Sequence, residues 1–84
     1  MRIQYTETAR KQLKKLDKTI QKRILDYMDE VGRLENPRSR GKALFENMRG
    51  LWRYRVGDYR VICEIQESRI IISVLKIGHY KNIY

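Results

Sequence analysis

The apolar positions at the start of the chain pass from strand-like alternation to helical spacing. Polar and apolar residues alternate over Arg2 to Tyr5, which predicts a short strand. Thr6 then offers a helix N-cap, and one helix face is apolar behind it: Ala9, Leu13 and Leu16. After a break at Asp17 to Thr19, with Thr19 as a candidate second cap, a longer apolar stripe follows: Ile20, Ile24, Tyr27, Met28, Val31 and Leu34. These segments predict a helical hairpin with one apolar seam.

The periodicity is lost from Glu35 to Gly50. Asn36-Pro37 and Gly41 are turn signals, so we expect this stretch to be a loop. Its positive charges lie at Arg38, Arg40, Lys42 and Arg49. Three apolar residues are expected to anchor the loop on the core: Leu44, Phe45 and Met48.

After Gly50 the pattern changes to a period of two. Trp52 to Val56 and Tyr59 to Ile65 both alternate, and Gly57-Asp58 between them predicts the two-residue turn of a hairpin. Arg69 to Ile77 is almost continuously apolar and predicts a central strand buried on both faces, before a short tail from Gly78 to Tyr84. The predicted order is β-α-α-β-β-β. It describes an α+β domain in which a short N-terminal strand and a helical hairpin pack on one face of a small, mainly antiparallel sheet.

The composition fits a single small domain spanning residues 1–84. With 42% hydrophobic residues, a chain of 84 residues can build one thin core. The 19 Lys and Arg against 10 Asp and Glu give a net charge of +9, which predicts a polyanionic partner. No apolar run is long enough to span a membrane, and the N-terminus lacks the apolar segment of a signal peptide. We therefore expect a soluble, cytoplasmic protein.

Neither a metal nor another cofactor is expected. Cys63 is the only cysteine and His79 the only histidine, which excludes a disulfide framework and a multi-cysteine zinc site. Cys63 falls on the apolar side of its strand, so we interpret it as an inert buried thiol. Any chemistry must come from basic and aromatic groups.

Three arginines are expected to share one face of the predicted hairpin. Arg53 and Arg55 are two residues apart on one strand, and Arg60 lies on the adjacent strand. We call this surface the arginine face. A guanidinium group matches the oxygens of a phosphate, so the face and the basic loop favour binding to nucleic-acid phosphates over an ordinary solvated strand face.

Two other groups of residues have simpler interpretations. Trp52 and Tyr54 alternate with the arginines and are expected to face the core rather than to act as platforms for bases. The basic residues of the first helix are expected to form a solvated face rather than a second nucleic-acid surface: Arg10, Lys11, Lys14, Lys15 and Lys18.

The only histidine lies just beyond the last predicted strand, beside Tyr80 and Lys81, with Tyr84 at the end. Histidine is the residue type that titrates nearest to neutral pH, so His79 is the candidate for proton transfer. If the tail folds back over the arginine face, Tyr80 or Tyr84 can stack on a base. The alternative is a histidine that is structural or simply exposed, and spacing alone favours that alternative.

Four parts of the chain carry a resemblance to a known family. The first is the order of a strand followed by a helical hairpin. The second is residues 48–56, Met-Arg-Gly-Leu-Trp-Arg-Tyr-Arg-Val, and the third is Asp58 to Ile62 with its Tyr-Arg-hydrophobic centre. The fourth is the ending at residues 77–84, Ile-Gly-His-Tyr-Lys-Asn-Ile-Tyr, a variant of a Gly-His-Arg-x-x-Val-Tyr tail. Over essentially its whole length the chain resembles the RelE-like branch of the RelE/ParE superfamily of bacterial toxins.

This resemblance implies a RelE-like fold and the toxin of a type II toxin–antitoxin system. Toxins of this branch are ribosome-dependent endoribonucleases, or mRNA interferases, which enter the A site and cut messenger RNA without a cofactor. The resemblance also implies a cognate RelB-like antitoxin, acidic or amphipathic, that wraps and neutralises the toxin. We expect the free toxin to be monomeric, to form larger assemblies with the antitoxin, and to have no membrane partner.

The resemblance further implies roles for residues at matching positions. Arg53 and Arg55 match two basic residues on the second strand, and Arg60 matches the arginine that follows the tyrosine of the third strand. His79 matches the general acid of YoeB-like relatives, which have a similar His-Tyr ending. Tyr84 matches the stacking tyrosine of the tail. These five residues are the predicted catalytic set.

The chain departs from the family's pattern at two positions. Tyr80 stands where many tails have arginine, so Lys81 or His79 is expected to replace the usual leaving-group contact. Arg55 stands where some relatives carry lysine, and because arginine is a poor proton acceptor, the general base stays unassigned. The residues predicted to bind the substrate are Tyr80, Lys81, Arg49 and Lys42.

The expected chemistry is a metal-independent attack of the ribose 2′-OH on its own phosphodiester. Arginines stabilise the dianionic phosphorane, and His79 protonates the departing 5′-oxygen. Since the site has few acid–base groups, the ribosome is expected to supply positioning. Two alternatives stay open: a ParE-like inhibitor of DNA gyrase with the same fold, and a basic RNA-binding module without catalysis. The proton donor and stacking ring of the tail favour the nuclease over the gyrase inhibitor.

Overall fold

Two helices and five strands make up the part of the chain that the computed structural model describes, residues 1–83. In chain order they are β1 (Arg2–Tyr5), α1 (Glu7–Lys14), α2 (Lys18–Arg33), β2 (Lys42–Ala43), β3 (Trp52–Val56), β4 (Tyr59–Gln66) and β5 (Ile71–His79). Three short 3-10 turns lie between them: η1 (Pro37–Ser39), η2 (Glu46–Met48) and η3 (Glu67–Arg69). The predicted α+β class is confirmed, with one strand more than expected.

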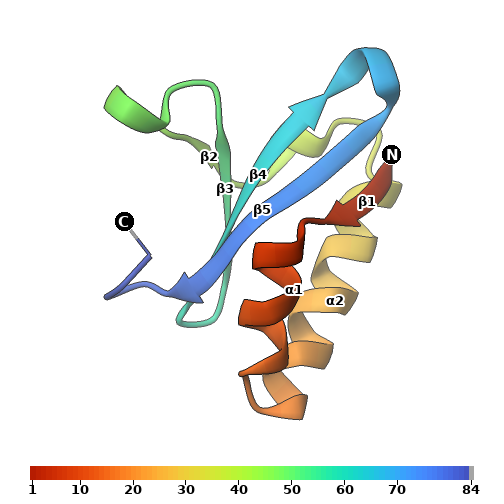
Figure 1. Ribbon diagram of the computed structural model, residues 1–84. Helices are drawn as coiled ribbons and strands as arrows, with labels where there is room; N and C mark the ends of the chain where they lie inside the picture. Colours follow the sequence, from red (N-terminus) through yellow and green to blue (C-terminus); the bar gives the residue numbers. More distant parts are fainter. Residues whose placement is uncertain (84) are drawn as a thin grey trace.

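The strands form a single sheet in the order β1-β5-β4-β3-β2. β1 runs parallel to β5, and every other neighbouring pair is antiparallel. Figure 1 shows α1 and α2 side by side on one side of this sheet, with the C-terminal residues on the other side. The prediction of a helical hairpin on one face of a mainly antiparallel sheet is therefore confirmed.

Both helices begin at a side-chain cap. The Thr6 hydroxyl accepts a hydrogen bond from the Ala9 N–H at 3.1 Å, as the sequence predicts. The second cap is Asp17 rather than Thr19, because the Asp17 carboxylate accepts the Thr19 N–H at 3.0 Å and α2 already begins at Lys18. No helix within residues 1–83 is long and apolar enough to cross a membrane.

The core lies between the helices and the sheet. Its buried members come from both layers: Ala9, Leu13, Ile24, Met28, Val31, Tyr54, Val56, Val61, Cys63, Ile72, Val74 and Ile77. Tyr54 is fully buried and Trp52 packs against the same core, so both lie on the side of the sheet that the sequence predicts. Cys63 is also fully buried, and burial raises the pKa of its thiol, which keeps it protonated and unreactive.

The stretch from Glu35 to Gly50 contains a strand that the sequence did not predict. Lys42 pairs with Arg53 and Ala43 pairs with Trp52, which adds β2 to the edge of the sheet. β2 has only 2 residues, too few to show alternation. Its existence therefore depends on the neighbouring strand rather than on a pattern of its own.

One apolar residue of this stretch does not anchor it. Phe45 is 76% exposed, so the prediction that it packs on the core is wrong. The segment is held instead through its backbone and through β3. The Leu44 N–H donates to the Leu51 carbonyl at 3.1 Å, and the Trp52 indole N–H donates to the Arg40 carbonyl at 2.7 Å.

The last strand lies two residues further along the chain than predicted. Arg69 belongs to η3, and β5 runs from Ile71 to His79. β4 begins at Tyr59, directly after the hairpin turn, and this first residue pairs with His79. The prediction that His79 lies beyond the strand is therefore wrong, because His79 pairs with Tyr59 in the antiparallel ladder between β4 and β5.

Candidate functional site

Cross-strand pairing brings the three arginines of the arginine face together. Arg55 pairs with Arg60 across the β3–β4 hairpin, and Arg60 pairs in turn with Gly78 of β5. Arg53 lies two residues before Arg55 on β3, so the two fall on the same face. The intervening Tyr54 is in the core, and the arginine face is therefore the side of the sheet away from the helices.

Two lysines extend the arginine face along the cross-strand row that contains Arg53. Lys42 pairs with Arg53, Arg53 with Ile62, and Ile62 with Lys76. The structure thus brings Lys42, predicted to bind substrate, next to the arginines. Lys76 was missed by the sequence reasoning, although a lysine within the apolar run of β5 is a visible signal.

The other basic residues of the segment before β3 contribute less to this surface. Arg49 is an exposed residue at the end of η2, and strand pairing does not bring it to the arginine face. Arg38 forms an ion pair with Glu67, and the Arg40 Nη2 lies 2.9 Å from a carboxylate oxygen of Glu30. These ion pairs lower the charge that the segment offers to a phosphate.

The guanidinium of Arg60 is held by the hairpin turn. Its Nη1 donates to the carbonyl oxygens of Gly57 and Tyr59, both at 3.1 Å. Gly57 has a φ of 59°, a conformation that tight hairpin turns require and that glycine adopts readily. The Arg60 Cζ also lies 5.5 Å from the centroid of the Tyr80 ring, within cation–π range. Among residues 1–83, Nε and Nη2 of this guanidinium make no hydrogen bond, and both are donors suited to an anion.

The His79 ring contacts two tyrosines at the end of the sheet. Its centroid lies 5.6 Å from that of Tyr59 in an edge-on arrangement, and 4.6 Å from that of Tyr80 with a tilt of 31°. The Lys81 backbone N–H donates to Nδ1 at 3.2 Å, so the neutral ring carries its proton on Nε2. By strand register His79 falls in the row next to Arg60, on the alternate face, and the Tyr80 ring links the two.

The C-terminal residues fold back over the arginine face. The Tyr80 N–H donates to the Asp58 carbonyl oxygen at 2.8 Å, which ties the tail to the hairpin turn. Ile83 is buried, and a Cβ added to Gly78 would lie 3.0 Å from its Cδ1. Because Gly78 is the strand partner of Arg60, Ile83 lies over the part of the arginine face where these two residues pair. Tyr84, predicted to stack, lies outside the described residues.

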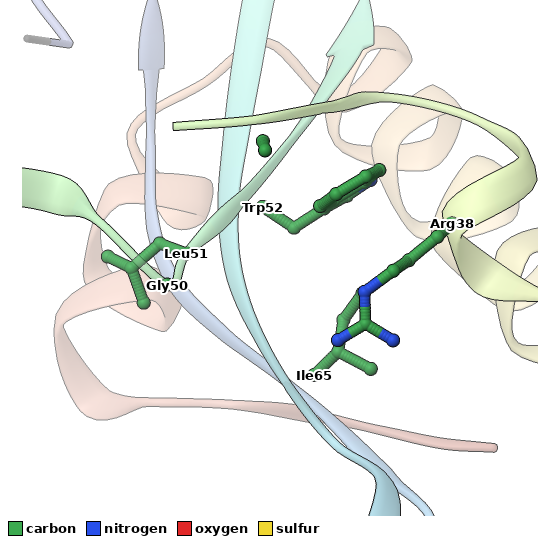
Figure 2. Close-up of a pocket in the computed structure, with 6 residues that line it drawn as sticks. Arg38, Gly50, Leu51, Trp52 and Ile65 are labelled. Carbon is green, nitrogen blue, oxygen red and sulfur yellow. The ribbon is translucent and has the colours of Figure 1, made fainter. Parts of the chain in front are cut away.

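A separate pocket of about 200 Å³ opens on the opposite face of the sheet. Its lining residues are Arg38, Ala43, Gly50, Leu51, Trp52 and Ile65. Figure 2 shows the Arg38 side chain reaching from η1 toward Ile65, below the ring of Trp52. Because Trp52 alternates with Arg53 along β3, this pocket does not belong to the arginine face.

The chemistry that the arginine face offers is cationic. Within residues 1–83, no group of three or more His, Cys, Asp or Glu side chains is placed to hold a metal ion. Arginine and lysine side chains bind anions, and an imidazole, which His79 supplies beside this face, is a side-chain type that transfers protons in catalysis. The basic residues of α1 are exposed on the other layer of the molecule, as expected for a solvated helix face.

Known proteins with similar sequences and folds are toxins of toxin–antitoxin systems. Residues 3–84 match the model of a family described as the ParE toxin of the type II toxin–antitoxin system parDE. The chain is 28% identical over 83 residues to Toxin RelG of Mycobacterium tuberculosis. The aligned region covers 98% of this chain and 93% of Toxin RelG.

Two solved structures share the fold. The toxin–antitoxin complex RelBE2 from Mycobacterium tuberculosis matches with a TM-score of 0.85 and 26% identity, over 93% of this chain and 88% of the matched chain. The archaeal RelE–RelB complex from Pyrococcus horikoshii OT3 matches with a TM-score of 0.75 and 27% identity, over 96% of both chains. The chain therefore belongs to the ParE toxin family of type II toxin–antitoxin systems, within the RelE/ParE superfamily of toxins.

Proposed function

We propose that this toxin is a ribosome-dependent endoribonuclease that cuts messenger RNA in the A site. The observation that carries the proposal is the linked pair of Arg60 and His79. The Arg60 guanidinium, whose Nε and Nη2 make no hydrogen bond within residues 1–83, and the His79 imidazole, with a proton on Nε2 in its neutral form, both contact the ring of Tyr80. The similarity to Toxin RelG and to the RelE proteins supports the nuclease branch of the superfamily.

The proposed reaction is an in-line displacement at one phosphodiester. A bond forms between the ribose 2′-oxygen and phosphorus, and the bond from phosphorus to the 5′-oxygen breaks. Arg53, Arg55 and Arg60 would hold the equatorial oxygens and stabilise the charge that develops on them, which is usually the largest catalytic contribution. Lys42 and Lys76 lie in the same cross-strand row as Arg53 and would contact neighbouring phosphates.

His79 would give the proton to the departing 5′-oxygen. To act as an acid, the ring would first take up a proton at Nδ1, which breaks the hydrogen bond from the Lys81 N–H. The resulting imidazolium would then donate its Nε2 proton. Arginine side chains are poor proton acceptors, so Arg55 is not proposed to take the 2′-OH proton. No residue of this chain is assigned as that acceptor. Tyr80, Lys81, Arg49 and Tyr84 remain proposed contacts to the RNA.

The ribosome would supply what this face lacks. An open sheet surface with one histidine binds phosphates but does not fix the 2′-oxygen in line with the leaving group. Holding reactants in a near-attack geometry can contribute about 7–11 kcal/mol. We therefore expect cleavage to depend on messenger RNA that the A site already holds in place.

The proposal is tested by primer extension on a defined messenger RNA incubated with purified ribosomes and the toxin. The expected result is a new 5′ end within the A-site codon, absent when ribosomes are omitted. An uncut messenger under conditions where expression of the toxin still arrests growth would overturn the nuclease assignment.

A second candidate function is inhibition of DNA gyrase. The matching family model is that of the ParE toxin, and the nuclease and the gyrase inhibitor share the fold. Supercoiling by purified gyrase, measured with and without the toxin, separates the two functions. Inhibition of supercoiling together with an intact messenger would favour the gyrase inhibitor. A protein that binds RNA and leaves both processes unaffected would be a binding module.

We also propose a cytoplasmic toxin neutralised by a RelB-like antitoxin. The two solved structures described above are complexes of a toxin with its antitoxin. The net charge of +9 suits an acidic partner, which would lower that charge in the complex. Toxin purified alone should sediment as a monomer, and toxin co-purified with its antitoxin should sediment as a larger assembly.

A further inference from the structure

The ring of Tyr80 connects the two groups that carry charge stabilisation and proton transfer in the proposed reaction. The Arg60 Cζ lies 5.5 Å from the ring centroid, and the His79 ring lies 4.6 Å from it. Lys81 adds a second cation, with its Nζ 6.0 Å from the same centroid. The backbone of Tyr80 is fixed by its hydrogen bond to Asp58, so the ring is held at the hairpin turn.

Strand pairing alone does not bring Arg60 and His79 together. Arg60 pairs with Gly78, whereas His79 pairs with Tyr59, and neighbouring rows of a sheet point to alternate faces. The C-terminal tail begins at Tyr80, directly after β5 ends at His79. Alternation along the strands places the Arg60 and His79 side chains on opposite faces of the sheet. Tyr80 follows His79 directly, and its ring contacts both side chains.

We propose that Tyr80 is a positioning residue, whose ring holds the Arg60 guanidinium and the His79 imidazole in one stack so that both act on the same phosphodiester. This inference rests on the proposed nuclease function. It gives Tyr80 a role within the protein, in addition to its proposed contact with the RNA.

The contacts of each partner show why the ring is needed. Within the described residues, the other hydrogen bonds of the Arg60 guanidinium are made through Nη1, to two carbonyl oxygens of the turn, and a guanidinium held at one end can pivot. Tyr59 and the Lys81 N–H fix the orientation and tautomer of His79 but not its distance from Arg60. Within residues 1–83, the ring of Tyr80 is the side chain that contacts both the guanidinium and the imidazole.

The first test needs neither RNA nor ribosomes. NMR spectra of the free toxin report the ring protons of His79 and the Nε–H of Arg60 in the wild type, in Tyr80→Phe and in Tyr80→Leu. We expect the ring-current shifts caused by residue 80 to persist in Tyr80→Phe and to be lost in Tyr80→Leu. His79 and Arg60 signals that stay at their wild-type positions in Tyr80→Leu would overturn the stack.

The second test measures cleavage on programmed ribosomes by the same variants. Tyr80→Leu should lower the rate by about 10- to 100-fold, as expected when reacting groups are misplaced, and Tyr80→Phe should restore most of it. Phe45→Leu removes a ring that is 76% exposed and outside the stack, and should cut at the wild-type rate with an unchanged melting temperature.

The outcomes distinguish this role from the others. Wild-type cleavage by Tyr80→Leu would overturn the positioning role, and equal losses in Tyr80→Leu and Tyr80→Phe would assign the effect to the hydroxyl instead of the ring. If the wild-type toxin does not cut messenger RNA at all, the nuclease proposal fails. The NMR comparison then still decides whether Tyr80 organises Arg60 and His79.

Discussion

Arg55 and Arg60 face each other directly across the β3–β4 hairpin, on the side of the sheet away from the helices. Like charges directly opposite one another in a sheet destabilise the fold, by a few tenths of a kcal/mol to about 1 kcal/mol. A ligand with negative charge between them removes this repulsion. The pairing therefore costs stability in the free toxin and favours the binding of a phosphate.

The first prediction concerns this repulsion. Arg55→Gln should raise the free energy of unfolding by up to about 1 kcal/mol at low salt, and the gain should shrink as added salt screens the charges. Urea unfolding at low and high ionic strength measures it. Arg2→Gln is the matched control, because Arg2 is an exposed strand arginine whose partner is Ile71. Equal gains in both variants would show that net charge, rather than the Arg55–Arg60 pairing, is responsible.

The second prediction concerns the glycine that leads into β2. Gly41 has a φ of 81°, and an added Cβ would lie 2.4 Å from the Arg53 carbonyl oxygen and 2.6 Å from the Trp52 Nε1. Gly41→Ala should therefore lower the free energy of unfolding by about 2–4 kcal/mol, because it adds both backbone strain and overpacking. The expected readouts are a lower melting temperature and a weakened hydrogen bond from the Trp52 indole to Arg40.

Gly50 provides the control for this substitution. Its φ of 92° is similarly left-handed, but an added Cβ would have no neighbour within 4 Å. Gly50→Ala should show the cost of backbone strain alone, about 1 kcal/mol. A Gly41→Ala variant no less stable than Gly50→Ala would contradict the close approach of Gly41 to β3.

The third prediction concerns alkaline pH. Burial, with smaller effects of Asp29 and Cys63, raises the pKa of Tyr5 from 10.0 to about 12. The unfolded chain therefore loses this proton first, and the free energy of unfolding should fall as the pH rises from about 10 to about 12. Tyr5→Phe should reduce that fall.

Below the ordinary pKa of tyrosine, Tyr5→Phe has a different effect. The Tyr5 hydroxyl is buried without a hydrogen-bond partner among the described residues, so its removal should leave stability unchanged or slightly raised. Urea unfolding of the wild type and the variant at neutral and alkaline pH measures both effects. Parallel curves for the two proteins across the alkaline range would show that Tyr5 does not titrate as described.

Much of this fold could be predicted because its elements have a clear period. The apolar stripe that includes Ile24, Met28 and Val31 predicts one buried helix face. Arg53 and Arg55 could be assigned to one face because side chains alternate along a strand. The match of Arg60 to that face required only a two-residue turn at Gly57-Asp58.

The parts that could not be predicted depend on contacts between distant segments. β2 is too short to have a period, and its pairing with β3 creates it. β5 ends at His79 because His79 pairs with Tyr59. The polar residues of the tail gave no sign in the sequence that the strand extends this far. The contact of Tyr80 with Arg60 joins the tail to a strand formed much earlier in the chain. No local pattern contains this information.

The most direct test of the nuclease proposal compares Arg60→Ala with Arg10→Ala by primer extension on programmed ribosomes. Arg10 is an exposed arginine of α1, so its removal lowers the charge equally without touching the arginine face. We predict that Arg60→Ala lowers A-site cleavage by about 100- to 1,000-fold while its fold stays intact, and that Arg10→Ala cuts like the wild type. A folded Arg60→Ala variant that cuts messenger RNA at nearly the wild-type rate would contradict the catalytic role of the arginine face.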